Sequence, residues 1–333
     1  MGPIPPAYQS NGKKKALIVG INYTGTRNAL GGCVNDAYNI REHLTQFCNY
    51  SRDPHFTRMM VDEPREGYVA QNIPTTRNLL DAFYWLVYDV QPGDTLFFSY
   101  SGHGGQTEDQ DGERANGLDD TICPVDFDRS GQIDSTLLHR CLVSALRPGV
   151  KLNVILDCCH SGTLLELPFT YRPDESGKMN TVQLVKRGMQ LAMRAQNLLQ
   201  GGFINPNAKG EIKGVMNEAK TLFNAITGTP NASTDEMGYK QENFQQSQYD
   251  GMKEAYCISG CQDEQTSADS SFNGRAAGAL THALLTTMRQ YPQGLSFETL
   301  LASLRGFMMN EQYTQIPQLS CGHKVDPRSL FVL

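Results

Sequence analysis

The sequence lacks the segments that direct a chain into a membrane or out of the cell. No apolar run approaches the roughly 18 residues that a membrane-spanning helix needs. The opening residues, MGPIPPAYQS, contain no basic region followed by an apolar one, so no secretory signal is visible. Pro6 stands where a myristoylation signal has Ser or Thr, and the last residues, SLFVL, carry no prenylation box. We therefore expect no membrane partner and a location in the cytoplasm, with the nucleus as a second compartment.

A disulfide framework and a zinc site are also missing. The nine cysteines are an odd number without regular spacing, and the sequence contains no C-x-x-C pair. Adjacent Cys158, Cys159 and His160, even together with His103, are poorly placed as ligands of a tetrahedral zinc ion. We expect reduced thiols, as in cytosolic proteins.

The chain has no excess of positive charge. Its net charge of −6 at pH 7 argues against nucleic acid or an anionic membrane as the main partner. Hydrophobic residues make up 39% of the sequence and charged residues 19%, which is ordinary for a soluble globular protein. A chain of 333 residues can bury a sizeable core as one large domain or two small ones.

Short apolar runs alternate with segments of helical periodicity along most of the chain. The pattern predicts strands at 16–22, 57–61, 95–101, 152–156, 255–259 and 330–333. It predicts helices at 35–47, 75–89, 135–146, 276–289 and 297–308, and a hairpin within 121–133. Strands alternating with helices indicate an α/β fold with a mostly parallel, doubly wound sheet.

Two of the predicted strands end in reactive side chains. The run KLNVIL leads into Asp157, Cys158, Cys159 and His160, and the strand TLFFSYS leads into glycine-flanked His103. The carboxyl ends of parallel strands are where α/β sheets place their ligands. We therefore expect a thiol nucleophile and its imidazole base to meet at this edge of the sheet.

Cys159 is the better candidate for the nucleophile. Side chains alternate along a strand, so Cys159 shares a side with Asp157 while Cys158 faces away. The backbone N–H groups of Gly104 and Cys159 could bind the developing oxyanion. The plainer alternative is that both thiols are inert core residues and that His103 is a turn residue.

Several motifs together resemble those of the metacaspases, the caspase-like peptidases of fungi, plants and protists, and most of all the fungal type I members. The carrying motifs are YSGHGG, DCCHSG, GINY, GCVNDA, GLDDTICPVDF and SGCQDEQTSAD. The resemblance runs from about Lys15 to the end of the chain, with residues 164–248 the least matched. The Pro/Gln-rich leader expected of type I members is all but missing, so residues 1–14 are expected to be a disordered tail or the stub of such a leader.

The resemblance implies a caspase-like three-layer α/β sandwich, in which a mostly parallel sheet of six or more strands has helices on both faces. It also implies a Cys159–His103 dyad and cleavage of peptides and proteins after Arg or Lys. A guanidinium needs carboxylates in a partly dry pocket. The family positions for that substrate-binding pocket fall on Cys33, Asp36, Ser101 and Asp157. Taken singly, Asp36 could instead interact with a helix dipole, and Asp157 with neighbouring N–H groups.

Calcium is the cofactor that the resemblance implies. The acidic stretch from Glu108 to Asp120 offers several carboxylates to such a hard cation. The family ligand positions match Asp119 and Asp120 firmly, and Asp109 and Glu166 less closely. A second acidic stretch, 126–137, begins like an EF-hand loop but has Leu137 where the loop needs Glu, so we interpret it as a hairpin turn. The alternative is a solvated acidic loop without an ion.

One peptidase domain over residues 15–333 is expected, with a large-subunit-like part at 15–213, a small-subunit-like part at 214–333 and a flexible linker within 164–250. Self-processing is predicted in this linker, after Lys213, which lies where related fungal enzymes cut, or else after Arg187. The resemblance implies a monomer. We considered two other functions: an amidotransferase, whose G-x-C-x-G elbow is missing, and a non-proteolytic scaffold or quality-control role of the same fold.

Overall fold

The computed structural model places a large part of the chain. It describes residues 12–65, 67, 69–109, 112, 117–158, 161–171, 235, 237–242, 253–260, 278–311, 313 and 315–333. The chain divides into two compact units, of which the first comprises 1–170 and 242–333 and the second 171–241. The predicted division at 213/214 falls outside the described residues, so it stays a prediction.

A large mixed sheet forms the centre of the first unit. Its strands follow the order β2 (Thr57–Val61), β1 (Lys14–Gly20), β3 (Thr95–Ser101), β7 (Lys151–Asp157), β10 (Glu254–Ser259) and β12 (Gln318–Cys321). The short strand β8 (Phe169–Tyr171) follows β12 in this order. The second unit contains the short strand β9 (Tyr239–Gln241). The pairs from β2 to β10 are parallel, and β12 runs antiparallel to β10. The prediction of a mostly parallel sheet is therefore confirmed.

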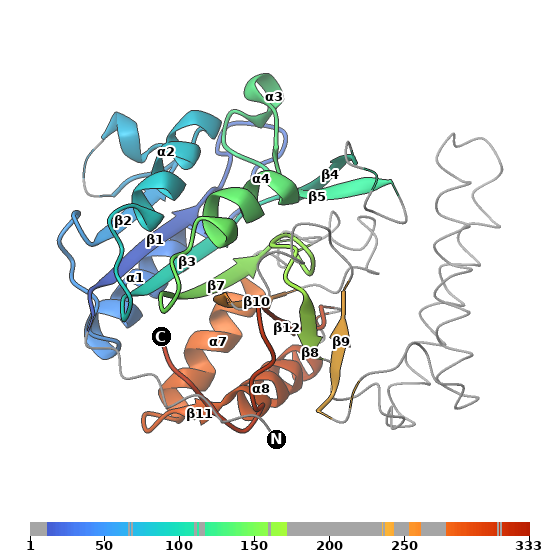
Figure 1. Ribbon diagram of the computed structural model, residues 1–333. Helices are drawn as coiled ribbons and strands as arrows, with labels where there is room; N and C mark the ends of the chain where they lie inside the picture. Colours follow the sequence, from blue (N-terminus) through green and yellow to red (C-terminus); the bar gives the residue numbers. More distant parts are fainter. Residues whose placement is uncertain are drawn as a thin grey trace. The chain divides into compact units, whose positions relative to one another are not determined.

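Alternate residues of the central strands point to opposite faces, and helices cover both faces (Figure 1). One face packs against α2 (Thr76–Val87) and α4 (Ser135–His139), which continues as a π-helical turn, Arg140–Ser144. The central strands β1, β3 and β7 contribute to that core Leu17, Val19, Leu96, Phe98, Tyr100, Leu152, Val154 and Leu156. The opposite face packs against α1 (Cys33–Phe47) and α7 (Ala279–Gln290), and α8 (Phe297–Asn310) packs against α7. This is the expected three-layer α/β arrangement.

The smaller elements include two further sheets. One contains β4 (Gly104–Glu108), β5 (Leu118–Ile122) and β6 (Ile133–Asp134), and the other pairs β11 (Leu295–Ser296) with β13 (Leu330–Phe331). Short helical turns lie at Ala70–Asn72 and at α3 (Phe127–Ser130). Of the predicted acidic loop, Glu108 ends β4, and Asp119 and Asp120 lie in β5, which pairs antiparallel with β4. Residues 330–331 pair with β11 rather than with the large sheet.

Local signals in the sequence set several of these boundaries. The Thr75 hydroxyl accepts a hydrogen bond from the Asn78 N–H at 3.3 Å and caps α2, as predicted. The Asp134 carboxylate caps α4 in the same way, at 2.7 Å from the Leu137 nitrogen. Among the helices that the structure describes, none combines the length and apolar character needed to cross a bilayer.

Candidate active site

The candidate site lies at the carboxyl ends of the three central strands. In the parallel register, Gly20 of β1 lies beside Ser101 of β3, and Ser101 lies beside Asp157 of β7. The carboxyl ends of these strands therefore lie at one edge of the sheet, and His103 follows the end of β3 at this edge. The predicted meeting of His103 with Cys159 stays a prediction, because Cys159 lies outside the described residues.

Asp157 is fully buried on the face of the sheet that α7 covers. One carboxylate oxygen, Oδ2, accepts a hydrogen bond from the backbone N–H of Thr281, in the first turn of α7, at 2.7 Å. The other oxygen, Oδ1, is buried and has no hydrogen-bond partner in the described part of the chain. The helix terminus thus holds the carboxylate in place and leaves one oxygen available to a ligand.

Asp36 supplies a second buried carboxylate, from the first turn of α1. Its side chain is only 7% exposed, and its Oδ2 also lacks a hydrogen-bond partner among the described residues. Burial raises the pKa of the Asp36 carboxyl, and the charge of Asp157 raises it further. The pKa of Asp157 is raised by burial as well. Each of these two neighbouring buried acids has an oxygen without a hydrogen-bond partner among the described residues, so the place favours a positively charged group.

Cys33 and Ser101 lie beside these acids, at positions expected to form the pocket walls. Both side chains are buried, and burial together with the charges of Asp36 and Asp157 raises the pKa of the Cys33 thiol. The Cys33 thiol therefore stays protonated in the neutral range, which argues against Cys33 as the nucleophile. A Cβ atom on Gly20 would lie 2.3 Å from the Cys33 carbonyl oxygen, so only glycine allows α1 to approach β1 this closely.

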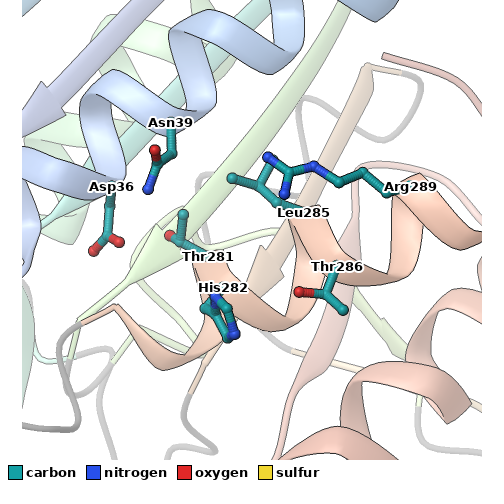
Figure 2. Close-up of a pocket in the computed structure, with 7 residues that line it drawn as sticks. All are labelled: Asp36, Asn39, Thr281, His282, Leu285, Thr286 and Arg289. Carbon is teal, nitrogen blue, oxygen red and sulfur yellow. The ribbon is translucent and has the colours of Figure 1, made fainter.

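A cavity of about 240 Å³ opens between α1 and α7 next to Asp36 (Figure 2). Figure 2 shows Asp36 and Asn39 on α1 facing Thr281 on α7, with the Arg289 side chain reaching toward them. The remaining lining residues are His282, Leu285 and Thr286. Sequence reasoning did not find the α7 residues, because nothing in their local pattern shows that this helix packs beside the acids.

His103 is held at several points. Its ring nitrogen Nε2 lies 2.8 Å from the backbone carbonyl oxygen of Asn28, and its ring packs against that of Tyr23, with the centroids 4.8 Å apart. Its backbone N–H donates to the Tyr23 hydroxyl at 3.0 Å. A carbonyl oxygen only accepts hydrogen bonds, so this contact places the proton on Nε2 and leaves Nδ1 as the basic nitrogen of the neutral ring.

Cys158 lies where strand alternation predicted. Its side chain is buried in the core that faces α2 and α4, on the side of the sheet opposite to Asp157. Gly104, a predicted oxyanion donor, is the first residue of β4, directly after His103. Cys159, the predicted nucleophile and second oxyanion donor, lies outside the described residues, as do Lys213 and Arg187.

The four predicted calcium ligands are all described. Asp119 and Asp120 are buried neighbours on β5, and Glu166 is buried after β7. The Asp120 carboxylate accepts hydrogen bonds from neutral groups, Gln106 Nε2 at 3.0 Å and the Thr163 hydroxyl at 2.5 Å. Asp109 is half-buried and accepts a hydrogen bond from the Gly112 N–H. Within the described residues, no group of three or more potential ligands gathers closely enough to hold an ion.

Comparison with known proteins defines the class first. The family described as "Metacaspase, peptidase C14 domain" matches residues 14–168, which include β1, β3, β7 and His103. A crystal structure of a protein from Geobacter sulfurreducens has a TM-score of 0.51 at 21% identity and covers 95% of this chain and 96% of that one. The fold and these motifs are those of the caspase-like cysteine peptidases.

Curated relatives then define the family. Metacaspase-1 of Schizosaccharomyces pombe is 40% identical over 324 residues, which cover 97% of this chain and 70% of that protein. Metacaspase-1 of Kluyveromyces lactis is 39% identical over 329 residues, and Metacaspase-1B of Neurospora crassa 38% over 326 residues. In both cases the match covers 98% of this chain and 70% of the relative. The chain belongs to the metacaspase family.

Proposed function

We propose that this peptidase is an endopeptidase that cleaves peptide bonds after Arg or Lys. The observation that carries the proposal is the pair of buried carboxylates, Asp36 and Asp157, each with an oxygen that lacks a hydrogen-bond partner among the described residues. A guanidinium or ammonium entering between them would supply the missing donors and cancel the repulsion between the two acids. An acidic side chain would add a third negative charge to the same place.

In this proposal, Cys159 attacks the scissile carbonyl carbon and its proton passes to Nδ1 of His103. The Asn28 carbonyl oxygen, which accepts from Nε2–H, stabilises the imidazolium that forms. The backbone N–H groups of Gly104 and Cys159 bind the oxyanion. The imidazolium then protonates the leaving amine, and water hydrolyses the acyl-enzyme with His103 again acting as base.

The choice of substrate is tested with three reporter peptides that differ only in Arg, Lys or Asp before the scissile bond. We expect hydrolysis of the Arg and Lys peptides and none of the Asp peptide. The Cys159→Ala variant is the control and should be inactive on all three. Preferential cleavage of the Asp peptide, or full activity of Cys159→Ala, would overturn the proposal.

Calcium stimulation is part of the same proposal, and it is supported by the burial of three carboxylate side chains, Asp119, Asp120 and Glu166. The described residues do not by themselves assemble an ion site, so no step of the mechanism depends on calcium. Repeating the peptide assay with calcium and with a chelator tests it, and equal rates would contradict stimulation.

Self-processing after Lys213, or else after Arg187, is expected from the same preference for basic residues. Incubating the protein with calcium should produce two fragments on a gel, and mass spectrometry identifies the bond. The Cys159→Ala variant should remain intact. An identical gel pattern for both proteins would contradict self-processing.

A further inference from the structure

Two buried tyrosines lie directly against the backbone of His103. Tyr23 follows β1 and Tyr100 lies in β3, and their side chains are 1% and 0% exposed. The two hydroxyl oxygens are 3.0 Å apart. A pair of hydroxyls in a dry core needs several polar partners, and the partners here belong to His103 and Cys123.

The hydroxyls hold both polar groups of the His103 backbone. The His103 N–H donates to the Tyr23 hydroxyl oxygen at 3.0 Å, and the Tyr100 hydroxyl donates to the His103 carbonyl oxygen at 2.8 Å. The residue before the histidine must be small to allow this, because a Cβ atom on Gly102 would lie 2.7 Å from the Tyr100 hydroxyl oxygen.

Cys123 supplies the remaining partners of the two hydroxyls. The Tyr23 hydroxyl donates to the Cys123 carbonyl oxygen at 2.6 Å. The Tyr100 hydroxyl lies within reach of two carbonyl oxygens, that of His103 at 2.8 Å and that of Cys123 at 3.0 Å, and the shorter contact is to His103. The Cys123 N–H donates to the Tyr100 hydroxyl oxygen at 3.2 Å. Each hydroxyl thus donates one hydrogen bond and accepts a backbone N–H. Burial raises the pKa of both tyrosine hydroxyls well above the ordinary value for tyrosine, so the hydroxyls remain protonated donors throughout the neutral range.

We infer that Tyr23 and Tyr100 are positioning residues that fix the catalytic base, an inference that rests on the proposed role of His103. The tyrosines hold its backbone, the Tyr23 ring packs against the imidazole, and the Asn28 carbonyl binds Nε2 from the β1–α1 connection. Together these contacts fix the imidazole and therefore the direction of Nδ1, the nitrogen that takes the Cys159 proton in the proposed mechanism. A misplacement of a catalytic group by about 1 Å can cost roughly 100-fold in rate.

The test compares Tyr23→Phe and Tyr100→Phe with a matched control, Tyr38→Phe. Tyr38 is also a buried tyrosine whose hydroxyl accepts a backbone N–H, from Arg65 at 2.7 Å, but it lies on α1. We expect kcat on the Arg peptide to fall about 10- to 100-fold in the first two variants, with KM changed less than about threefold. In Tyr38→Phe both constants should stay near those of the parent enzyme.

A second readout follows the thiol–imidazole pair itself. The rate at which iodoacetamide abolishes activity, measured against pH, reports the thiolate of the nucleophile. This profile should shift in Tyr23→Phe and Tyr100→Phe and stay unchanged in Tyr38→Phe. A substitution that only lowered stability would not shift the profile. If neither phenylalanine variant folds, Gly102→Ala gives the second test, because its Cβ would lie 2.7 Å from the Tyr100 hydroxyl oxygen and disturb the same contacts. The profile should shift in this variant as well, and a parent-like profile would overturn the positioning role.

The outcomes separate this inference from the proposed function. If His103→Ala or Cys159→Ala keeps full activity, the proposed dyad fails. If both are inactive while the tyrosine variants match Tyr38→Phe in kcat and in pH profile, the dyad stands and the positioning role is overturned. Adding Tyr23→Phe to His103→Ala should cause no further loss of residual activity, because the tyrosine acts through the histidine.

Discussion

At the scale of single residues, ionisation of the buried carboxyl groups of Asp36 and Asp157 lowers the stability of the folded protein. Both carboxyl groups are buried with an oxygen lacking a hydrogen-bond partner among the described residues, and burial raises the pKa of each. An acid whose pKa is raised by folding favours the folded state when protonated. This contribution to stability is present below the ordinary carboxyl pKa of about 4 and is lost as pH rises through the raised value. A basic ligand that binds the ionised pair has the opposite pH dependence.

Replacing Asp36 with Asn should therefore separate stability from binding. Near pH 8, we expect Asp36→Asn to raise the free energy of unfolding by about 1–2 kcal/mol, because it removes a buried charge. We expect kcat/KM on the Arg peptide to fall roughly 10- to 100-fold, the loss of one charge-assisted hydrogen bond. Thermal melts at pH 5 and pH 8 and peptide kinetics measure the two effects.

The matched control is Asp81→Asn, which changes an exposed acid on α2 and should alter neither quantity. The parent protein should also bind basic peptides more weakly as pH falls below the raised pKa values. A KM for the Arg peptide that is constant between pH 5 and pH 8 would contradict ionisation of the pair on binding.

At the scale of elements, the site depends on where α1 and α7 begin. The first turn of α1 carries Asp36, and the first turn of α7 donates the Thr281 N–H to Asp157. Gly278, immediately before α7, has a φ of +96°, and a Cβ atom there would lie 2.9 Å from the Asp36 Oδ2. This glycine lets α7 start against the acid pair.

A methyl group at this position should therefore disturb both the fold and the pocket. Gly278→Ala should lower the free energy of unfolding by about 1–2 kcal/mol, the cost of a left-handed backbone for a residue with a Cβ. It should also raise KM for the Arg peptide, because the methyl displaces the Asp36 carboxylate. Thermal melts and peptide kinetics provide the measurements.

Gly306→Ala is the control for glycine replacement in general. Gly306 lies inside α8 with open space around its Cβ position, so alanine should stabilise the helix by up to about 1 kcal/mol without changing KM. If both variants have the parent KM, the packing of α7 against Asp36 is not needed for substrate binding.

The sequence predicted elements with strong apolar patterns and missed those without them. Strands at 57–61 and 95–101 and the Thr75 cap were found because branched apolar runs and a capping hydroxyl are local signals. Strand β4 was missed because GGQTE contains no apolar side chain. Strand β12 was missed because QLSC is too short and too mixed to give an apolar pattern. These strands form only by pairing with β5 and β10.

The same distinction holds within the site. The strand-end motifs pointed to His103 and Asp157, and the resemblance to the metacaspases pointed to Asp36. The backbone carbonyl of Asn28 and the Thr281 N–H were not predicted, because a backbone group acts whatever side chain stands there. Tyr23 and Tyr100 lie within motifs that were recognised, but the contacts of their hydroxyls with each other and with His103 become visible only in the structure.

At the scale of the whole molecule, the last two residues of the sequence accept hydrogen bonds from lysines at the amino ends of two central strands. Lys14 of β1 donates to the Leu333 carbonyl oxygen at 2.9 Å, and Lys151 of β7 donates to that of Val332 at 2.6 Å. Burial lowers the pKa of the Lys151 ammonium to about 8. These contacts lie at the end of the sheet opposite to the candidate site, so they should affect stability alone.

Lys151→Met should reveal this buried charge in the pH dependence of unfolding. A lysine whose pKa is lowered by folding makes the folded state more stable as pH rises from about 8 toward the ordinary value of about 10.4. We expect Lys151→Met to reduce this rise, measured by urea unfolding at pH 7.5 and pH 10, and to leave kcat unchanged. Lys253→Met, a lysine that also binds backbone carbonyls, is the control and should keep the rise. A parent-like rise in Lys151→Met would contradict the assignment.

The connection between β1 and α1 has a consequence for anyone who wishes to redesign the enzyme. Within a short span it carries Tyr23 and the Asn28 carbonyl, which hold His103, and it leads directly into Cys33 and Asp36 at the acid pair. In the proposed mechanism, this one continuous segment thus contributes both to substrate recognition and to proton transfer. Changing the selectivity should succeed with point changes at 33 and 36, whereas exchange of the entire segment should displace the imidazole along with the pocket.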